Sequence, residues 1–361
     1  MLLESIKLKQ FKNHSDFFGQ WQSGFNFIVG PNGVGKTNII DAIYYTAMLK
    51  SYFHNSDKQI TQKGTDFYRL EALFSQENSV YKLEVKSSSQ IKEIKWDGNI
   101  IDKIVDHVGK IPVVLISPDD IFYFFNESEE RRKFLNQTII QFDQNYLNYL
   151  IRYTKALKLR NALLKNFNNS KEANYLLDSY DQVLVQTGIY IANKRREVVS
   201  QLQIYLEVFV DQISNNFQKS TMIFKSQVNA DFDSVLKQNR HKDIVTQRSN
   251  FGIHKDQLEC TIDLLPIREF GSQGQLKSFI LALRLAQYKL MKQIAEKSPM
   301  VLLDDIFAKL DADRVNNLLA CLEQESVVQC FITDTHIDRI KQLENRIHSN
   351  TLILNLSNTN G

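Results

Sequence analysis

The hydrophobic pattern of the first 120 residues predicts β-strands arranged around one helix. Residues 25–29 form a mostly apolar run, which is typical of a buried strand. Apolar side chains then recur at helical spacing between residues 39 and 47. Three later segments alternate between apolar and polar positions, and these are residues 67–74, 80–86 and 91–96. We therefore expect two strands within residues 1–30, then a helix, a small β meander and a buried strand at 111–116.

Residues 121–217 show helical periodicity instead, with no proline and a single glycine. In the first half, Leu150, Leu157 and Leu164 lie seven residues apart, with Tyr146 and Tyr153 interspersed. The second half has an apolar series with steps of three and four, formed by Leu177, Tyr180, Leu184, Thr187, Ile191, Val199, Leu202, Leu206, Phe209 and Ile213. These two series predict an antiparallel helical hairpin with its turn at residues 166–170.

The rest of the chain alternates between strands and helices again. Strands are predicted at 222–224, 258–262, 299–305, 327–333 and 351–356, and helices at 278–294, 313–324 and 336–343. The fold class is therefore α/β, interrupted by a helical insertion. We expect three segments: the N-terminal half of the α/β lobe at 1–120, the helical lobe at 121–217, and the C-terminal half of the α/β lobe at 218–361.

The composition changes this picture little. The 361 residues are 43% hydrophobic and 24% charged, which suits a globular protein of two domains or one domain with a large insertion. The net charge of +3 permits a polyanionic partner without arguing for one. Cys260, Cys321 and Cys330 form no C-x-x-C pair, so we expect reduced thiols. With no signal-peptide pattern and no apolar run of about 18–20 residues, we expect a cytoplasmic protein without a membrane segment.

Residues 30–37 fit the G-x-x-x-x-G-K-[ST] motif of phosphate-binding loops and lie between a predicted strand and a predicted helix. Glycines let backbone N–H groups approach phosphate oxygens, and the helix N-terminus adds partial positive charge. Lys36 can reach the β- and γ-phosphates, and the Thr37 hydroxyl can bind Mg²⁺. The predicted nucleotide-binding residues are Gly30, Pro31, Asn32, Gly33, Val34, Gly35, Lys36 and Thr37. The alternative is a glycine-rich turn without a ligand, which the strand–turn–helix context disfavours.

Two further segments carry chemistry. The apolar run 301–303 ends in Asp304 and Asp305, which is the Walker B pattern. Asp304 is predicted to hold Mg²⁺ opposite Thr37. Asp305 is predicted to orient or deprotonate the attacking water. A strand that ends in a solvated acidic turn is the alternative. Before the helix at 278–294, Ser272, Gly274 and Gln275 suit an anion at a helix N-terminus, and the alternative there is an ordinary capped loop.

The order of these segments resembles that of the ATP-binding-cassette ATPases. In that family the S-x-G-Q signature closes over the γ-phosphate held by a second subunit. The resemblance implies an ATP-dependent homodimer, with Ser272, Gly274 and Gln275 reaching the nucleotide of the other copy. It also places His336 at the position of a γ-phosphate sensor, although a structural histidine is an equal alternative. The catalytic residues predicted on this basis are Asp305, Lys36 and Ser272.

The chain resembles the RecF family most closely, within the chromosome-maintenance branch of these ATPases. The segments that carry this resemblance are Phe11–Asn13, Gly30–Asn38, Ile116–Asp120, Glu129–Asn136, Phe251–Leu258, Gly271–Gln275 and Leu303–Asp311. The match adds Asn38 to the nucleotide-binding residues. The chain departs from the family pattern at Ile253, Lys255 and Leu276, and Lys255 lacks the two-pronged guanidinium with which an arginine binds phosphate.

The resemblance implies a weak, DNA-stimulated ATPase that acts as a switch in recombinational repair and replication restart. It implies ATP-driven dimerisation on gapped DNA or single-/double-strand junctions, slow hydrolysis, and loading of RecA with RecR and RecO as partners. Two alternatives remain open at this point. One is a short ATPase of the SMC/Rad50 type, and the other is the nucleotide-binding subunit of a transporter.

Basic residues gather around the predicted helical lobe. The clusters are Arg131-Arg132-Lys133, Lys194-Arg195-Arg196, Arg240-His241-Lys242, and the helix face with Arg152, Lys155 and Lys158. Each cluster taken singly is more typical of a solvated helix surface. Their concentration in one lobe predicts a shallow surface that contacts DNA phosphates without reading bases.

Overall fold

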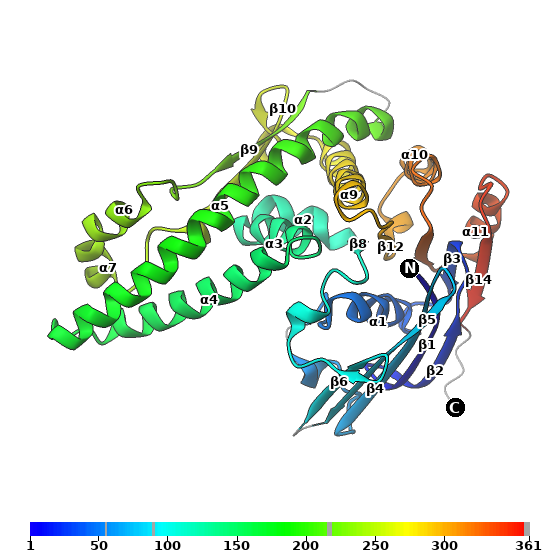
Figure 1. Cartoon of the computed structure of the whole chain (residues 1–361). Coiled ribbons are helices and arrows are strands. Elements are labelled where there is room, and N and C mark those ends of the chain that lie inside the picture. Colours follow the sequence, from blue (N-terminus) through cyan, green and yellow to red (C-terminus); the bar gives the residue numbers. More distant parts are fainter. Residues whose placement is uncertain (55, 89–90, 215–218, 357–361) are drawn as a thin grey trace. The chain divides into compact units, whose positions relative to one another are not determined.

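The computed structural model describes residues 1–54, 56–88, 91–214 and 219–356 (Figure 1). The chain forms two compact units, and each is described by itself. The first, which we call the sheet unit, contains Met1–Phe122, Tyr205–Gln218 and Ser272–Gly361. The second, which we call the helical unit, contains Tyr123–Ile204 and Lys219–Gly271.

A parallel five-stranded sheet forms the centre of the sheet unit. Its order is β14 (Thr351–Asn355), β3 (Gly24–Val29), β13 (Gln329–Asp334), β12 (Met300–Leu303) and β8 (Val113–Ile116). The strands β3, β8, β12 and β13 consist entirely of buried residues, as their apolar sequences predict. Because the strands are parallel, the ends of β3, β12 and β13 meet at one edge of the sheet, where ligands bind in open α/β sheets.

The β meander forms a second, antiparallel sheet in the same unit. Its order is β2 (His14–Gln20), β1 (Leu2–Phe11), β4 (Phe67–Gln76), β5 (Ser79–Ser88), β6 (Lys92–Trp96) and β7 (Asn99–Ile100). The prediction of two strands within residues 1–30 is wrong, because the structure has three there. The chain reverses at Lys12, whose φ is 53°, and returns as β2 beside β1 before β3 begins.

Helices complete the sheet unit. They are α1 (Lys36–Met48), α9 (Gln273–Ala295), α10 (Ala312–Gln324) and α11 (Ile337–Glu344), with short 3₁₀ turns η1 (Asp57–Gln59), η2 (Ile104–Asp106) and η4 (Ile306–Ala308). Helix α2 (Pro118–Asn126) lies across the boundary between the two units in the sequence. The elements predicted from periodicity in this part of the chain are all present, with ends that differ by a few residues.

The helical unit contains the predicted hairpin. Helices α4 (Gln144–Lys165) and α5 (Lys171–Ser214) lie side by side and antiparallel (Figure 1), with the turn between them at residues 166–170 as predicted. The unit also contains α3 (Ser128–Ile139), α6 (Phe232–Gln238), α7 (Arg240–Thr246), α8 (Ile267–Phe270), the turn η3 (Ile253–Lys255), and a sheet of β11 (Leu265–Pro266), β10 (Gln257–Ile262) and β9 (Ser220–Lys225).

This division differs from the three predicted segments. Residues 219–271, expected in the α/β lobe, belong to the helical unit because buried ion pairs join them to its helices. Arg160 of α4 donates to Asp243 at 2.7 Å, and Arg195 of α5 donates to Asp256 at 2.6 Å. The last residues of α5, expected in the helical lobe, belong to the sheet unit, where the Ile213 carbonyl accepts a hydrogen bond from α10.

The buried stripe of α4 also differs from the leucine series. Leu164 is buried, but Leu150 and Leu157 are only half-buried, whereas Tyr146, Tyr153 and Arg160, also seven residues apart, are buried. The period is therefore as predicted and both tyrosines lie on the buried face, but that face also contains a fully buried arginine in place of the first two leucines. Hydrophobicity alone could not indicate this, since an unpaired arginine is among the least favourable residues in a core.

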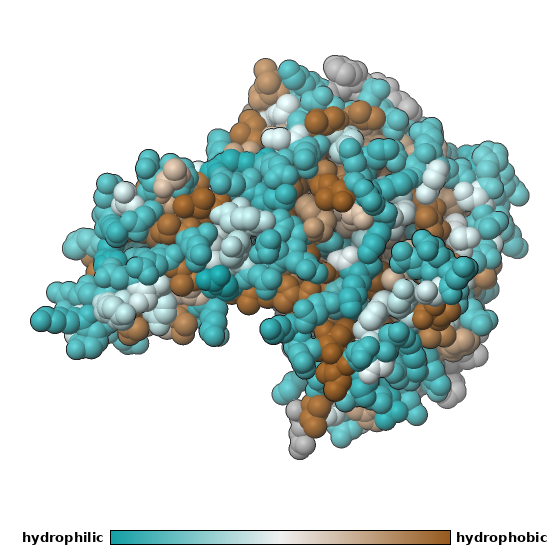
Figure 2. Space-filling view, viewed as in Figure 1, coloured by the Kyte–Doolittle hydropathy of each residue, from teal (hydrophilic) through white to brown (hydrophobic). Residues whose placement is uncertain are grey.

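Among the described residues, no helix is both long enough and apolar enough to span a membrane. On the face that Figure 2 shows, hydrophilic side chains cover most of both units. The three cysteines are free thiols, with Cys321 and Cys330 buried and Cys260 half-buried.

Candidate nucleotide-binding site

The predicted phosphate-binding loop connects β3 to α1. Gly33 and Gly35 have φ angles of +83° and +105°, in the left-handed region where other residues are strained. Gly30 has an ordinary φ but a different constraint, since a Cβ atom there would lie 2.5 Å from the carbonyl oxygen of Leu356. Two glycines are thus required by backbone conformation and one by close packing of the chain.

The loop opens into a cavity of about 180 Å³. Its lining consists of Asn32, Gly33, Gly35, Lys36, Thr37, Asn38 and Asp305. Helix α1 begins at Lys36, so the unpaired N–H groups of its first turn lie at this cavity. The structure therefore brings most of the predicted loop residues together with the second Walker B acid, around a helix N-terminus suited to an anion.

Lys36 lies over its own loop. Its Nζ donates to the carbonyl oxygens of Gly30 at 2.7 Å and Pro31 at 2.9 Å. Burial lowers the pKa of the Lys36 ammonium, and the carboxylates of Asp305 and Asp304 oppose this shift. The ammonium is thus held at the loop by carbonyl acceptors, within a cavity that phosphate oxygens fit.

Thr37 and Asp304 meet as the predicted Mg²⁺ ligands should. The Thr37 Oγ1 donates to Asp304 Oδ1 at 3.0 Å, and Thr333 Oγ1 donates to the same oxygen at 2.9 Å. Burial raises the pKa of the Asp304 carboxyl, while the two hydroxyl bonds act in the opposite direction. One hydroxyl and one carboxylate, completed by phosphate oxygens and water, suit the octahedral oxygen coordination of Mg²⁺.

Asp305 has an unusual backbone conformation. Its φ is +44°, which costs free energy for a non-glycine residue, and its N–H donates to Thr333 Oγ1 at 2.7 Å. Its side chain lines the cavity. Burial raises the pKa of the Asp305 carboxyl, and the Lys36 ammonium opposes the shift. A strained backbone that places a carboxylate in a cavity is the geometry expected of a functional acid.

Two residues at the site were not predicted as nucleotide-site residues. The turn from β1 to β2 brings His14 Nε2 within 3.1 Å of the Gly35 carbonyl, and Asn13 Nδ2 donates to the Gly33 carbonyl at 3.2 Å. Asn38 in turn donates to Asn13 Oδ1 at 2.6 Å. Burial lowers the pKa of His14, and its hydrogen bond to Gly35 opposes this. Asn13 belongs to one of the segments that carry the family resemblance, but neither residue was assigned to the nucleotide site, because the contact depends on the unpredicted strand β2.

The predicted signature lies at the start of α9. Ser272 is the N-cap: its Oγ accepts the Gln275 N–H at 3.2 Å, and Gln275 Oε1 accepts the Ser272 N–H at 2.6 Å. The Ser272 side chain is exposed, and Gly274 packs against the guanidinium of Arg314. In the described part of this chain no hydrogen bond connects Ser272, Gly274 or Gln275 with the phosphate-binding loop.

His336 is the N-cap residue of α11. Its N–H donates to Asp334 Oδ1 at 2.9 Å, and the residue is exposed. It does not line the cavity of the loop. Asp334, by contrast, is buried at the end of β13, and its carboxylate is paired with Arg339 at 3.2 Å. In this conformation, the charged groups at the end of β13 are Asp334 and Arg339, which pair with each other, and the His336 side chain is not part of that pair.

The basic clusters of the helical unit are mostly occupied by contacts within that unit. Arg131 donates to the carbonyl oxygens of Phe124 and Phe125 at 2.8 and 3.1 Å. Arg132 donates to the carbonyl oxygen of Asp256 at 3.0 Å. These two guanidinium groups satisfy backbone acceptors, which limits their availability to a ligand.

The other clusters behave similarly. Arg195 is 2% exposed and pairs with Asp256, while Arg240 pairs with Asp178 and Asp181 at 2.6 and 2.7 Å. The predicted phosphate-contacting surface of the helical lobe therefore loses most of its arginines to structural contacts. On its α4 face, Arg152, Lys155 and Lys158 remain exposed, and Arg152 donates to Gln186 Oε1 at 3.3 Å.

A row of three cations that form no ion pair in the described structure lies instead on the exposed face of the antiparallel sheet. Lys9 of β1 is directly opposite Arg69 of β4, which is directly opposite Lys86 of β5. All three are exposed, and among the described residues none forms an ion pair. In the strand register, Asp16 of β2 lies opposite one end of the row and Glu93 of β6 lies opposite the other. Neighbouring residues on such a face lie about 4.5–5.5 Å apart, so like charges repel across the strands.

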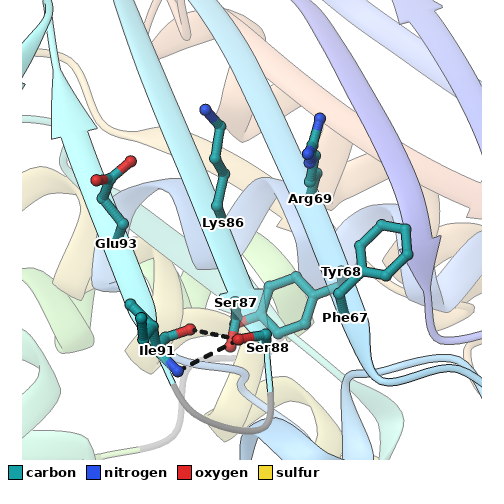
Figure 3. Close-up of a pocket in the computed structure, with 8 residues that line it drawn as sticks. All are labelled: Phe67, Tyr68, Arg69, Lys86, Ser87, Ser88, Ile91 and Glu93. Atoms are coloured by element: carbon teal, nitrogen blue, oxygen red, sulfur yellow. Dashed lines mark hydrogen bonds between the residues drawn. The ribbon is translucent and has the colours of Figure 1, made fainter.

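Other cations of this sheet face are neutralised. Lys82 pairs with Glu71 and Glu84 at 3.2 and 3.0 Å, and Lys95 pairs with Glu93 at 3.1 Å. Figure 3 shows Arg69, Lys86 and Glu93 standing on the same side of three neighbouring strands. They border a cavity of about 260 Å³, with Phe67 and Ile91 among the other lining residues. We call Lys9, Arg69 and Lys86 the cation row.

Comparisons with known proteins agree with the geometry over the whole chain. The family model for the RecF/RecN/SMC N terminal domain matches residues 2–351. The chain is 37% identical over 359 residues to the DNA replication and repair protein RecF of Flavobacterium johnsoniae, covering 99% of this chain and all of that protein. It is 35% identical over 341 residues to RecF of Cytophaga hutchinsonii, covering 94% and 90%.

A solved structure of the recombination mediator protein RecF with ATP, in the RecFOR pathway, has the same fold. It aligns with a TM-score of 0.85 at 26% identity and covers 93% of this chain and 92% of that one. The similarity includes both halves of the sheet unit and the helical insertion. Such coverage favours the RecF resemblance over the transporter-subunit alternative.

Proposed function

The chain belongs to the RecF family of DNA replication and repair proteins, and we propose that it is a recombination mediator switched by ATP. The observation that carries the proposal is the meeting of Lys36, Thr37 and Asp304 with Asp305 at one sheet edge. Those groups have the charges and positions needed to hold a nucleoside triphosphate and Mg²⁺. Full-length similarity to RecF proteins supports the biological setting.

In this proposal the loop N–H groups and Lys36 hold the phosphates, and Thr37 with Asp304 holds Mg²⁺. The nucleotide supplies a phosphoanhydride bond whose cleavage resets the switch. Asp305 accepts a proton from, or orients, the attacking water. Asn13 and His14 support the loop from β1 and β2, so they act as positioning residues.

Each site is completed by a second copy of the chain. The exposed Ser272 at the capped start of α9, with Gly274 and Gln275, meets the nucleotide of the other copy. Support comes from the exposure of Ser272, and from the lack of hydrogen bonds between this segment and its own phosphate-binding loop in the described residues. Nucleotide occupancy then determines dimerisation, and slow hydrolysis determines release.

DNA is the proposed polyanionic partner, at gaps or at junctions between single and double strands. The cation row supports a contact with its backbone, because unpaired cations on a sheet face gain from phosphate neutralisation. RecR is the proposed protein partner, with RecO and RecA acting in the same loading reaction. Hydrolysis is proposed to be weak and stimulated by DNA.

Light scattering with and without ATP and gapped DNA tests this proposal. We expect a monomer alone and a dimer when ATP and DNA are both present. Lys36→Met should abolish nucleotide binding and dimerisation, because the loop loses its only side-chain cation. Lys36→Arg should keep binding and folding but slow hydrolysis, because arginine keeps the charge in a different geometry. A wild-type protein that stays monomeric with ATP and DNA would contradict the proposal.

A further inference from the structure

A further cavity in the sheet unit lies between α10 and α11, apart from the nucleotide cavity and from the cavity beside the cation row. Its volume is about 320 Å³, at the lower limit for ligand pockets, so it fits one or two side chains better than a nucleotide. Phe307, Leu310, Val315 and Leu343 supply its apolar surface. Phe307, Val315 and Leu343 are 4–6% exposed, so they form a buried apolar surface, which we call the apolar floor, at the bottom of the cavity.

The polar part of this lining is positively charged. Arg339 and Arg346, seven residues apart at the C-terminal part of the chain, both line the cavity. The lining contains no carboxylate. Arg346 is exposed and has no acidic partner among the described residues, whereas Arg339 is paired with Asp334. Guanidinium groups bind carboxylates through paired hydrogen bonds, which lysine cannot match.

We propose that this α10–α11 cavity binds an acidic peptide segment of a partner protein, with one bulky apolar side chain inserted. The apolar floor receives that side chain, as at the hot spots of peptide interfaces. Arg346 and Arg339 bind the flanking carboxylates. Charge complementarity favours this occupant, because a basic or neutral segment would leave the exposed guanidinium of Arg346 without a carboxylate acceptor.

The cavity is connected to the nucleotide site through Arg339. This guanidinium bonds Asp334, and the Asp334 carbonyl accepts the N–H of Gly30 at 3.2 Å, at the start of the phosphate-binding loop. On the other side, Phe307 and Leu310 closely follow Asp305 in the chain. A peptide carboxylate that binds Arg339 competes with Asp334, so peptide and nucleotide affect each other's affinity. This coupling rests on the proposed function, whereas the binding itself does not.

The binding test uses fluorescence anisotropy with three labelled peptides of equal length. The acidic peptide is Ser-Asp-Asp-Leu-Phe-Asp-Ser, the basic control replaces each Asp by Lys, and the polar control replaces Leu-Phe by Ser-Ser. We expect the acidic peptide to bind at least about tenfold more tightly than either control. Equal binding of the three peptides, or no binding of the acidic one, would overturn the proposal.

Two variants locate the site. Arg346→Ala should weaken the acidic peptide about tenfold and leave ATP affinity unchanged, because Arg346 has no bond toward the nucleotide site. Lys341→Ala removes the same charge from an exposed position of α11 outside the cavity and should have no effect. If the two variants behave alike, the peptide binds elsewhere. Loss of peptide binding on ATP-driven dimerisation would assign the cavity to the dimer interface and also overturn the proposal.

The coupling is tested by measuring ATP affinity with and without saturating peptide. We expect a change of about fivefold or more, with the same factor for peptide affinity at saturating ATP, because coupling is reciprocal. Arg339→Ala should reduce this factor to one. If wild-type protein binds peptide but not ATP, the proposed function fails and the cavity proposal stands. If it binds both without coupling, the connection through Arg339 is wrong.

Discussion

The cations of the helical unit and those of the antiparallel sheet have opposite surroundings. In the helical unit, Arg160 is fully buried between Asp181 and Asp243, and Arg195 is 2% exposed beside Asp256. On the sheet, the cation row is exposed and forms no ion pair within the described residues, and Asp16 and Glu93 lie opposite its two end lysines in the strand register. Clustering in the sequence is stronger in the helical unit, yet the sheet has the charges that are free to bind.

This difference in the surroundings of the cations shows that the density of lysine and arginine along a chain does not by itself locate a polyanion-binding surface. A guanidinium whose donors are already satisfied gains little from a phosphate, and moving it would leave a buried carboxylate unpaired. Residues 60 positions apart, such as Lys9 and Arg69, become neighbours only through strand register. The register therefore identifies the row, and the sequence alone does not.

The largest effect we expect is on folding. Arg160→Met should lower the free energy of unfolding by about 3–5 kcal/mol, because the buried Asp243 loses its cationic partner and Asp181 keeps only Arg240. Chemical denaturation monitored by circular dichroism measures this. Lys158→Met, on an exposed position of the same helix, is the matched control and should change stability by less than about 0.5 kcal/mol. Equal effects of the two substitutions would mean that the buried ion pairs do not hold the helical unit together.

The next effect is on DNA binding by the cation row. The triple variant Lys9→Gln, Arg69→Gln, Lys86→Gln should bind gapped DNA at least about tenfold more weakly near 0.1 M salt. The slope of log K against log salt should also become shallower by about three units, one for each lost phosphate contact. Anisotropy titrations at several salt concentrations measure both.

The control for this variant removes the same charge from paired lysines. Lys82→Gln, Lys95→Gln, Lys237→Gln changes three cations that have carboxylate partners. It should leave the salt slope nearly unchanged, because those charges are already compensated. If both triple variants lower affinity equally, net charge alone explains binding, and the comparison between paired and unpaired cations fails.

A smaller effect concerns the stability of the sheet. Arg69→Gln removes the central cation, which faces Lys9 and Lys86, and relieves two like-charge pairs that each cost about 0.2–1 kcal/mol. The free energy of unfolding should therefore rise by about 0.5–1 kcal/mol at low salt, and the gain should shrink as salt screens the repulsion. A decrease in stability would show that Arg69 has a structural role like that of Arg160.

These surroundings also explain what could be predicted from the sequence. The positions of Gly33, Gly35, Lys36 and Thr37 in one turn could be predicted because a local motif fixes the backbone conformation there. The positions of Asp304 and Asp305 beside that turn could be predicted because both acids directly follow a short apolar strand. The helical hairpin followed from periodicity, since its turn and both helices depend on neighbouring residues in the chain.

The residues that were missed depend on contacts distant in sequence. Asn13 and His14 reach the phosphate-binding loop only because β2 forms beside β1, and β2 is too polar to show a clear alternation. Arg160 occupies a core position that hydrophobicity excludes. The boundary of the helical unit was misplaced because the buried pair of Arg195 and Asp256, 61 positions apart, joins β10 and its neighbours to α5.

The smallest expected effect gives the most direct test of the difference between the cations of the two regions. Lys155 and Lys158 are exposed on the α4 face where DNA contact was predicted, next to Arg152, and no ion pair holds the two lysines in the described structure. Lys155→Gln, Lys158→Gln should weaken gapped-DNA binding by less than about twofold, since two solvated lysines on a convex helix face are too few to follow a phosphate backbone. The measurement is the same salt titration as for the cation row. A slope that becomes shallower by about two units would show that α4 contacts phosphates, and the DNA surface would then include the helical unit.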